Sequence, residues 1–346
     1  MSWQKPTLTI TNLTTGYCSK NRQYPVSEHL CASLFAGELT CLLGANGSGK
    51  STLLRTLTSF LQPLAGEIYL LDKPLSQYSR DDMARLVGVV LTDKVEVRDM
   101  CVRDLVAMGR MPYTGFWGRL STSDEVTVNE AMNSVGIAYL AQRSLHSLSD
   151  GEMQKALIAK TLAQETPFIF LDEPSAFLDY ASKVDLFMLL RRLAVEKQKT
   201  IFMSTHDLDL VLQMADCLWL LHESEGLHTG IPEDLVALGY LDRLFRNDNL
   251  KFSAEQMSYY VQMPLRNDCR KHNIQLVGTE GQNRKLLQRA LNRMGMSCMA
   301  TEAEAKLQIC IAQETPIYTL KKQADILKQT DLIGDLLQEI SACMDY

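Results

Sequence analysis

The sequence lacks the features that mark membrane-spanning, secreted and metal-knuckle proteins. No run approaches the roughly 18–20 uncharged apolar residues of a membrane-spanning helix, and the first residues lack the apolar core of a signal peptide. The nine cysteines are scattered and none forms a C-x-x-C pair, so neither a zinc knuckle nor a disulfide framework is indicated. We therefore expect free thiols in a reducing cytoplasm.

Basic residues are also fewer than acidic residues. The chain has 35 Lys and Arg against 41 Asp and Glu, a formal net charge of −6, which argues against nucleic-acid binding through a broad basic face. Its 346 residues, 46% hydrophobic and 22% charged, are typical of a soluble globular protein. The length predicts about two domains.

The first part of the chain alternates strand-like and helix-like runs, as α/β domains do. Short apolar runs predict strands at 8–13, 38–43, 66–71, 86–91, 168–171 and 200–204, and helical runs lie at 50–60, 101–108, 123–135 and 151–164. Beyond the polar, turn-prone segment 246–251 we expect a small α+β domain at 249–346. Its predicted strands are 274–277, 307–311 and 317–320, and its predicted helices are 281–294 and 329–342.

A complete G-x-x-x-x-G-K-[ST] motif stands between a predicted strand and a predicted helix. It comprises Gly44, Ala45, Asn46, Gly47, Ser48, Gly49, Lys50 and Ser51. Glycines let backbone N–H groups turn inward around a polyphosphate, and the helix N-terminus adds the positive end of its dipole. We expect Lys50 to reach the β- and γ-phosphates and Ser51 to hold Mg²⁺. The motif predicts a nucleoside triphosphate site.

Two acidic residues and a histidine follow later strands. The run 168–171 delivers Asp172 and Glu173 to the carboxyl edge of the sheet, beside the glycine loop. We expect Asp172 to act on the metal through its water shell and Glu173 to polarise the attacking water. His206 follows the strand at 200–204 to the same edge, where we expect it to contact the γ-phosphate.

A third element is the segment Leu148-Ser149-Asp150-Gly151-Glu152, which directly precedes a predicted helix. Ser149 is well placed to cap that helix, and this structural role is compatible with a ligand contact. Taken in order, these motifs resemble those of the ATP-binding cassette (ABC) ATPases over roughly residues 7–245. The resemblance implies a P-loop NTPase fold in a nucleotide-binding domain at 1–248. Such a domain has a RecA-like core, an antiparallel β subdomain and a helical subdomain, here at about 93–165.

The resemblance also assigns roles to individual residues. It implies ATP and Mg²⁺ as ligands, Tyr17 as the ring that stacks on adenine, Thr52 beside the phosphates, and Asp179 in the D-loop. An ordinary half-buried tyrosine is the alternative for Tyr17. The family further implies a head-to-tail homodimer, in which Ser149 and Gly151 bind the nucleotide held by the other copy.

Three positions depart from the family pattern. Asp150 and Glu152 replace residues of the signature Leu-Ser-Gly-Gly-Gln, and their carboxylates near an anionic ligand suggest weaker nucleotide-driven closure. Thr92 aligns with the Q-loop glutamine, which in the family touches Mg²⁺ and links to the transporter subunit. Because a hydroxyl has a shorter reach, we expect coupling through the loop to persist with a weaker metal contact.

The segment after Thr92 narrows the family. Val-x-x-Leu-Val-x-x-Gly-Arg-x-Pro from Val102, followed by Trp-Gly-Arg-Leu, is similar to the iron-siderophore, haem and cobalamin importer ATPases. The resemblance implies an ATP-hydrolysing subunit on the cytoplasmic face of the inner (plasma) membrane. Its partners would be integral-membrane permease subunits and, indirectly, a periplasmic or lipoprotein substrate-binding protein, with no nucleic acid. Arg110, Pro112, Tyr113, Phe116, Trp117 and Arg119 suit a socket for a partner helix, and packing within the helical subdomain is a compatible alternative.

Other functions remain open at this point. A transporter ATPase for another solute, such as manganese, zinc or an amino acid, is the first. A soluble cassette ATPase of translation or chromosome work is less favoured, because the chain has one phosphate loop and only 98 residues from Ser51 to Ser149. A small-molecule P-loop kinase would have no need of the signature or of His206. For 249–346 we expect an accessory or regulatory domain.

Overall fold

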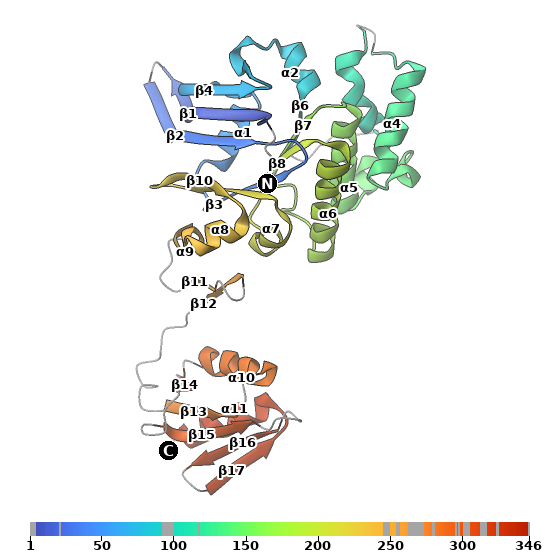
Figure 1. Cartoon of the computed structure of the whole chain (residues 1–346). Coiled ribbons are helices and arrows are strands. Elements are labelled where there is room, and N and C mark those ends of the chain that lie inside the picture. The colour runs from blue at the N-terminus through green and yellow to red at the C-terminus, as the bar shows by residue number, and fades with distance from the viewer. Residues whose placement is uncertain are drawn as a thin grey trace. The chain divides into compact units, whose positions relative to one another are not determined.

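The computed structural model describes residues 5–20, 22–91, 100–115, 118–244, 250–253, 257–261, 273–278, 281–294, 296, 298–299, 305–311, 317–322 and 325–344. The chain divides into two compact units (Figure 1). The first comprises Met1–Arg246 and Phe252–Ser258, and the second comprises Asn247–Lys251 and Tyr259–Tyr346. Among the described helices, none combines the length and apolar character needed to cross a membrane.

A six-stranded sheet forms the centre of the first unit, in the order β10-β9-β3-β8-β7-β6. The strands are β3 (Leu39–Gly44), β6 (Val87–Val90), β7 (Phe168–Asp172), β8 (Thr200–Ser204), β9 (Cys217–His222) and β10 (Gly226–Gly230). Every residue of β3, β7 and β8 is buried, as expected for parallel strands covered on both faces. Since these three strands are parallel neighbours, their carboxyl ends meet at one edge of the sheet.

A second, antiparallel sheet has the order β2-β1-β4-β5. Its strands are β1 (Leu8–Ser19), β2 (Arg22–Leu34), β4 (Ala65–Leu70) and β5 (Lys73–Pro74). Helix α1 (Lys50–Leu57) contributes Leu53, Leu54 and Leu57 to one core with strands of both sheets. Each such fully buried side chain is worth about 1.5–3 kcal/mol. This core therefore fixes α1, and with it the glycine loop at its N-terminus.

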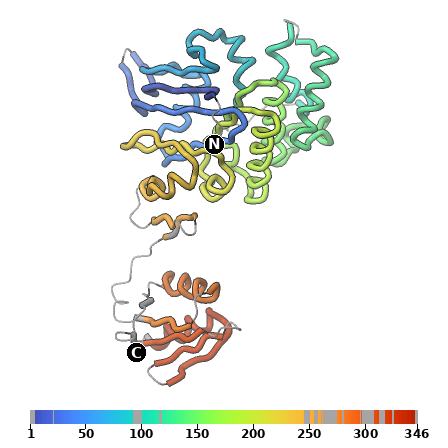
Figure 2. The backbone as a smooth tube through the Cα atoms, viewed as in Figure 1, coloured from blue at the N-terminus to red at the C-terminus, as the bar shows by residue number. Residues whose placement is uncertain are grey.

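The helical part of the first unit follows β6, and Figure 2 traces its path in green. It contains α3 (Val102–Ala107), the 3₁₀ segment η2 (Met108–Tyr113), α4 (Thr122–Ser134) and α5 (Asp150–Ala163). Gly109 is required here, because a Cβ at that position would lie 2.2 Å from the Lys160 carbonyl oxygen. The remaining helices of the unit are α2 (Arg80–Leu86), α6 (Tyr180–Lys197), α7 (Leu208–Met214), α8 (Pro232–Ala237) and α9 (Tyr240–Leu244).

The second unit holds a five-stranded sheet in the order β14-β13-β15-β16-β17. Its elements are β13 (Asn273–Val277), α10 (Gln282–Arg293), β14 (Cys298–Met299), β15 (Ala305–Ile311), β16 (Tyr318–Lys322), β17 (Asp325–Thr330) and α11 (Ile333–Met344), and the hairpin β11 (Leu250–Ser253) and β12 (Ser258–Val261) precedes them. Both helices share an apolar core with the strands. The predicted helix at 329–342 is wrong at its start, because β17 extends to Thr330 and pairs there with β16.

Candidate active site

The glycine loop after β3 has the geometry of a phosphate cradle. Gly47 and Gly49 have φ angles of 82° and 97°, which glycine adopts at no steric cost. The Lys50 ammonium donates hydrogen bonds to the carbonyl oxygens of Gly44 and Ala45, at 3.0 and 3.1 Å. Ser48 Oγ is buried and, among the described residues, has no hydrogen-bond partner. An orphaned donor and a cation at a helix N-terminus fit a phosphate group.

Burial lowers the pKa of Lys50, while the nearby carboxylates of Glu173 and Asp172 act in the opposite direction. Lys50 as a whole residue is only 6% exposed, so its charge is weakly screened by water. A bound phosphate would supply further negative charge and favour the protonated amine. The site is thus electrostatically prepared for an anion.

Oxygen atoms suited to a magnesium ion converge beside this loop. Ser51 Oγ donates to Asp172 Oδ1 at 3.3 Å, and Ser204 Oγ donates to the same oxygen at 2.6 Å. Hydroxyl and carboxylate oxygens are the ligands that Mg²⁺ prefers, together with substrate phosphates. The donor set therefore fits the ion. Thr92, the third predicted metal contact, lies outside the described residues.

Glu173 and His206 meet at the same edge of the sheet. Glu173 has a φ angle of 45°, a left-handed conformation that is uncommon and strained for a residue other than glycine. Its backbone N–H donates to Ser204 Oγ at 2.9 Å. His206 Nε2 lies 2.8 Å from Glu173 Oε1, and both side chains are partly exposed. The pair is open to water and to a ligand in the glycine loop.

Sequence reasoning missed the residues that hold this edge in place. Ser204 bridges Asp172 and the Glu173 backbone, and Asp207 accepts hydrogen bonds from Ser175 Oγ and Lys183 Nζ. The loop that carries His206 is thereby tied to the segment after Glu173. Ser204 and Asp207 lie within two residues of His206, and this closeness in sequence is the signal that could have identified them. Nothing local marks Lys183, which reaches the site from α6.

Two tyrosines flank the loop on the antiparallel sheet. The Tyr17 hydroxyl lies 3.2 Å from Thr52 Oγ1, and the residue is 44% exposed. Tyr24 is its direct cross-strand partner and is also exposed. Because directly opposite residues share one face of a sheet, both rings lie on the face that meets α1. An aromatic surface is therefore available beside the phosphate cradle.

The signature residues do not join this site within one chain. Ser149 caps α5, and with Gly151 it lines a cavity of about 140 Å³ whose wall includes Tyr139 and Gln154, not the glycine loop. Asp179 is likewise engaged locally, because its Oδ1 accepts a hydrogen bond from the Ser182 N–H at 2.7 Å and caps α6. The predicted site residues thus form two separate groups.

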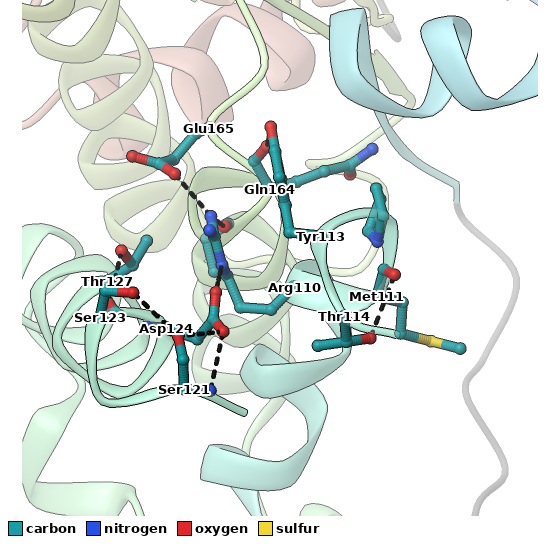
Figure 3. Close-up of polar contacts among 12 residues, drawn as sticks. Arg110, Met111, Tyr113, Thr114, Ser121, Ser123, Asp124, Thr127, Gln164 and Glu165 are labelled. Carbon is teal, nitrogen blue, oxygen red and sulfur yellow. Dashed lines mark hydrogen bonds and ion pairs between the residues drawn. The ribbon is translucent and has the colours of Figure 1, made fainter. Parts of the chain in front are cut away.

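The predicted helix socket requires a correction at Arg110, which is 7% exposed and faces inward (Figure 3). Its Nε donates to Asp124 at 2.8 Å, and its Nη1 donates to Glu165 at 2.6 Å and to the Ala163 carbonyl at 2.8 Å. Its guanidinium also stacks on the Tyr113 ring. Arg110 therefore ties the helical subdomain together and is unavailable to a partner. Arg119 is exposed, Pro112 is half-buried, and Phe116 and Trp117 lie outside the described residues.

Comparison with known proteins decides the family. A family model described as ABC transporter matches residues 28–176. The chain is 36% identical over 233 residues to the ferric enterobactin transport ATP-binding protein FepC of Escherichia coli strain K12, an alignment that covers 67% of this chain and 84% of that protein. The chain belongs to the ABC transporter ATP-binding protein family.

Further relatives agree with this assignment. The petrobactin import ATP-binding protein FpuD of Bacillus anthracis is 36% identical over 221 residues, which cover 64% of this chain and 81% of that protein. A solved structure described as an inward-facing ABC transporter of metal-chelate type has a TM-score of 0.61 and 27% identity, covering 74% of this chain and 96% of that one. The predicted P-loop ABC fold is confirmed, and this ABC ATPase binds and hydrolyses ATP.

Proposed function

We propose that this ABC ATPase powers import of a ferric siderophore or a related iron, haem or cobalamin chelate. The observation that carries the proposal is the similarity to ATP-binding proteins named for ferric enterobactin and petrobactin transport. A complete set of nucleotide-handling residues supports it, because these residues serve an energy-coupling subunit. The chelate itself would be bound by other subunits.

ATP binding follows from the geometry of the glycine loop. The Lys50 ammonium exchanges the carbonyls of Gly44 and Ala45 for the β- and γ-phosphates, and the inward N–H groups and Ser48 Oγ donate to the same anion. The exposed Tyr17 ring stacks on the adenine. Ser51, Asp172 and Thr92 would hold Mg²⁺, which when bound neutralises charge on the phosphates.

Hydrolysis depends on Glu173. Its carboxylate accepts a hydrogen bond from a water molecule and orients that water for attack on the γ-phosphorus, yielding ADP and phosphate. His206, which holds Glu173 Oε1 at 2.8 Å, contacts the γ-phosphate and keeps the carboxylate turned toward it. The Ser204 hydroxyl maintains the strained Glu173 backbone through this step.

A second copy of the chain completes the site. Ser149 and Gly151 line a cavity that does not include the glycine loop of their own chain, and the N–H groups at the start of α5 suit a phosphate. In a head-to-tail homodimer, these two residues and Asp179 contact the ATP held by the partner subunit. ATP binding then closes the dimer, and hydrolysis allows it to open.

A groove of about 580 Å³ suits a permease helix. Its lining includes Phe60 from the segment after α1, Met83 from α2, Val89 from β6 and Gln164, the residue after α5. Phe60 is 63% exposed there, which offers an apolar contact. Because the groove lies between the core and the helical subdomain, movement of these two parts when the dimer closes would also move a helix bound in it. Through this permease the ATPase would sit at the cytoplasmic face of the membrane, and a periplasmic or lipoprotein binding protein would deliver the chelate.

Transport in vesicles tests this function. The ATPase is reconstituted with the permease that co-purifies with it, and ATP-dependent uptake of a ferric siderophore, haem and cobalamin is compared. We expect uptake of one of the three, and none with the Glu173→Gln variant. Uptake restricted to manganese, zinc or an amino acid would contradict the proposed substrate class. Absence of any co-purifying permease would contradict a transport role.

A further inference from the structure

The hydroxyl of the signature serine is already occupied within its own chain. Ser149 Oγ donates to Glu152 Oε2 at 3.0 Å, and the Ser149 backbone N–H donates to the same oxygen at 2.8 Å. The Glu152 N–H in turn donates to Ser149 Oγ at 3.3 Å. This reciprocal pair is a capping box at the start of α5. The single proton of the Ser149 hydroxyl is therefore committed to a carboxylate.

The surroundings favour an anion at this position. The N-terminus of α5 carries the positive end of the helix dipole. Arg143 lies alongside, with its Nη1 3.5 Å from Glu152 Oε1 and its Nη2 donating to the Ser147 carbonyl at 2.6 Å. Hydrogen bonding from Ser149 lowers the pKa of Glu152, so the side chain is ionised near neutral pH. Glu152 thus supplies the negative charge that a phosphate would otherwise bring.

Two anions consequently compete for one donor. In the closed dimer of the proposed function, Ser149 donates to the ATP held by the partner subunit. In the open state the Glu152 carboxylate accepts the hydrogen bond from the Ser149 hydroxyl, and its negative charge would repel the incoming phosphate. We propose that Glu152 is a positioning residue that acts through Ser149 and raises the ATP concentration needed to close the dimer. This inference rests on the proposed function.

The chain contains a matched control. Ser79 and Asp82 form the same reciprocal capping box at the start of α2, with Ser79 Oγ donating to Asp82 Oδ2 at 2.7 Å and the Ser79 N–H donating to it at 3.1 Å. Asp82 is also ionised, because hydrogen bonds from Ser79 lower its pKa. That box lies outside both groups of nucleotide-site residues. Removing its charge tests for general effects of a weakened helix cap.

The experiment measures dimerisation of the full chain against ATP concentration by analytical ultracentrifugation. All proteins carry Glu173→Gln so that ATP is not consumed, and Glu152→Gln or Asp82→Asn is added. Glutamine keeps an oxygen that accepts from the Ser149 N–H, so the cap survives without its charge. We expect Glu152→Gln to lower the ATP concentration at half-dimerisation by about threefold to tenfold, the order of magnitude of the effect of one charge near a helix N-terminus. Asp82→Asn should leave it unchanged.

A kinetic measurement separates this role from a merely structural one. With Glu173 intact, Glu152→Gln should lower the KM for ATP more than it changes kcat. A fall in Tm with no change in the ATP midpoint would show that Glu152 only caps α5, and would overturn the inference. An equal shift in Asp82→Asn would overturn it too. If the Glu173→Gln protein forms no ATP-dependent dimer at all, the proposed function itself falls.

Discussion

A single hydroxyl, that of Ser204, organises the hydrolytic edge of this site. It donates to Asp172 and accepts from the Glu173 backbone, so it couples the proposed metal ligand to the proposed base. Ser204 is completely buried, and water has no direct access to replace it. The strained backbone of Glu173 thus depends on a residue that touches no substrate.

The Glu173→Gln variant tests the base directly. A glutamine cannot accept the hydrogen bonds of the attacking water as a carboxylate does, so we expect turnover to fall by at least about 100-fold. ATP-dependent dimers should persist, because the phosphate cradle is intact. Steady-state phosphate release and sedimentation measure the two properties. Wild-type turnover would remove Glu173 from the mechanism.

The Ser204→Ala variant tests the support of that base. Loss of the hydroxyl leaves the partly buried Glu173 N–H without its acceptor, at a cost of at most about 1–3 kcal/mol, the range for a fully buried donor. We expect kcat to fall by about tenfold or more while the KM for ATP changes little, since Lys50 and the loop are untouched. Phosphate release at varied ATP gives both constants. An unchanged kcat would mean that Glu173 keeps its position without Ser204.

At the scale of elements, Arg110 joins three pieces of chain. It connects η2 to α4 through Asp124 and to the end of α5 through the Ala163 carbonyl and Glu165. Tyr113 then lies between Arg110 and Arg85 of α2, whose guanidinium is 5.5 Å from the ring centroid. The helical subdomain is therefore held by an internal cation as well as by apolar packing.

Removing this cation should destabilise the subdomain. In Arg110→Met the buried Asp124 loses its partner, and breaking a buried ion pair in this way costs about 3–5 kcal/mol. Calorimetry should show a lower Tm for the first unit. Arg119→Ala, an exposed arginine of the same segment, serves as the control and should unfold like the wild type. Equal Tm values for all three proteins would contradict the role of Arg110.

The Asp124 carboxylate should make the stability of the subdomain depend on pH in acid. Hydrogen bonds from the Ser121 side chain and backbone and from Arg110 lower the pKa of Asp124 from 3.8 to about 2. A depressed pKa contributes stability above the unfolded value, and that contribution is lost as the pH falls from about 4 to about 2. The Tm advantage of the wild type over Asp124→Asn should shrink through this window. A constant advantage between pH 5 and pH 2 would refute the link.

Local signals were sufficient for part of the molecule and insufficient for the rest. The glycine loop, Glu173 and His206 could be predicted because each motif stands at the end of a short apolar strand, and parallel strands bring those ends together. The burial of Arg110 could not be predicted, because Glu165 is 55 residues away in sequence and no local pattern indicates that the two residues pair. The start of α11 was missed for a related reason: β17 is stabilised by pairing with β16, and its own sequence is polar.

At the scale of the whole molecule, the second unit is an independent core added to a cassette. Its sheet and two helices bury their own apolar side chains, among them Ile274, Leu291, Ile309 and Leu336. The alignments to FepC and FpuD span 233 and 221 residues of the 346 in this chain. An accessory role for residues 249–346, in regulation or in strengthening the dimer, is our proposal.

Deleting residues 262–346 tests that role and keeps the β11–β12 hairpin. We expect the first unit to remain folded and to hydrolyse ATP because, among the described residues, the core that fixes α1 contains none from the second unit. Dimerisation in the Glu173→Gln background should require more ATP than in the full chain. Basal phosphate release and sedimentation supply the two readouts. If both match the full chain, the second unit acts on another component of the transporter.

The hydrogen bonds of Lys50 carry one more consequence, which concerns entropy. With its ammonium bound to the carbonyls of Gly44 and Ala45, the glycine loop is cross-linked internally before any phosphate arrives. When ATP binds, the Lys50 ammonium exchanges these carbonyl oxygens for phosphate oxygens, and the loop does not have to become ordered. Such preorganisation removes an ordering cost from association. The affinity for ATP then depends mainly on the free energy of removing water from the highly charged triphosphate.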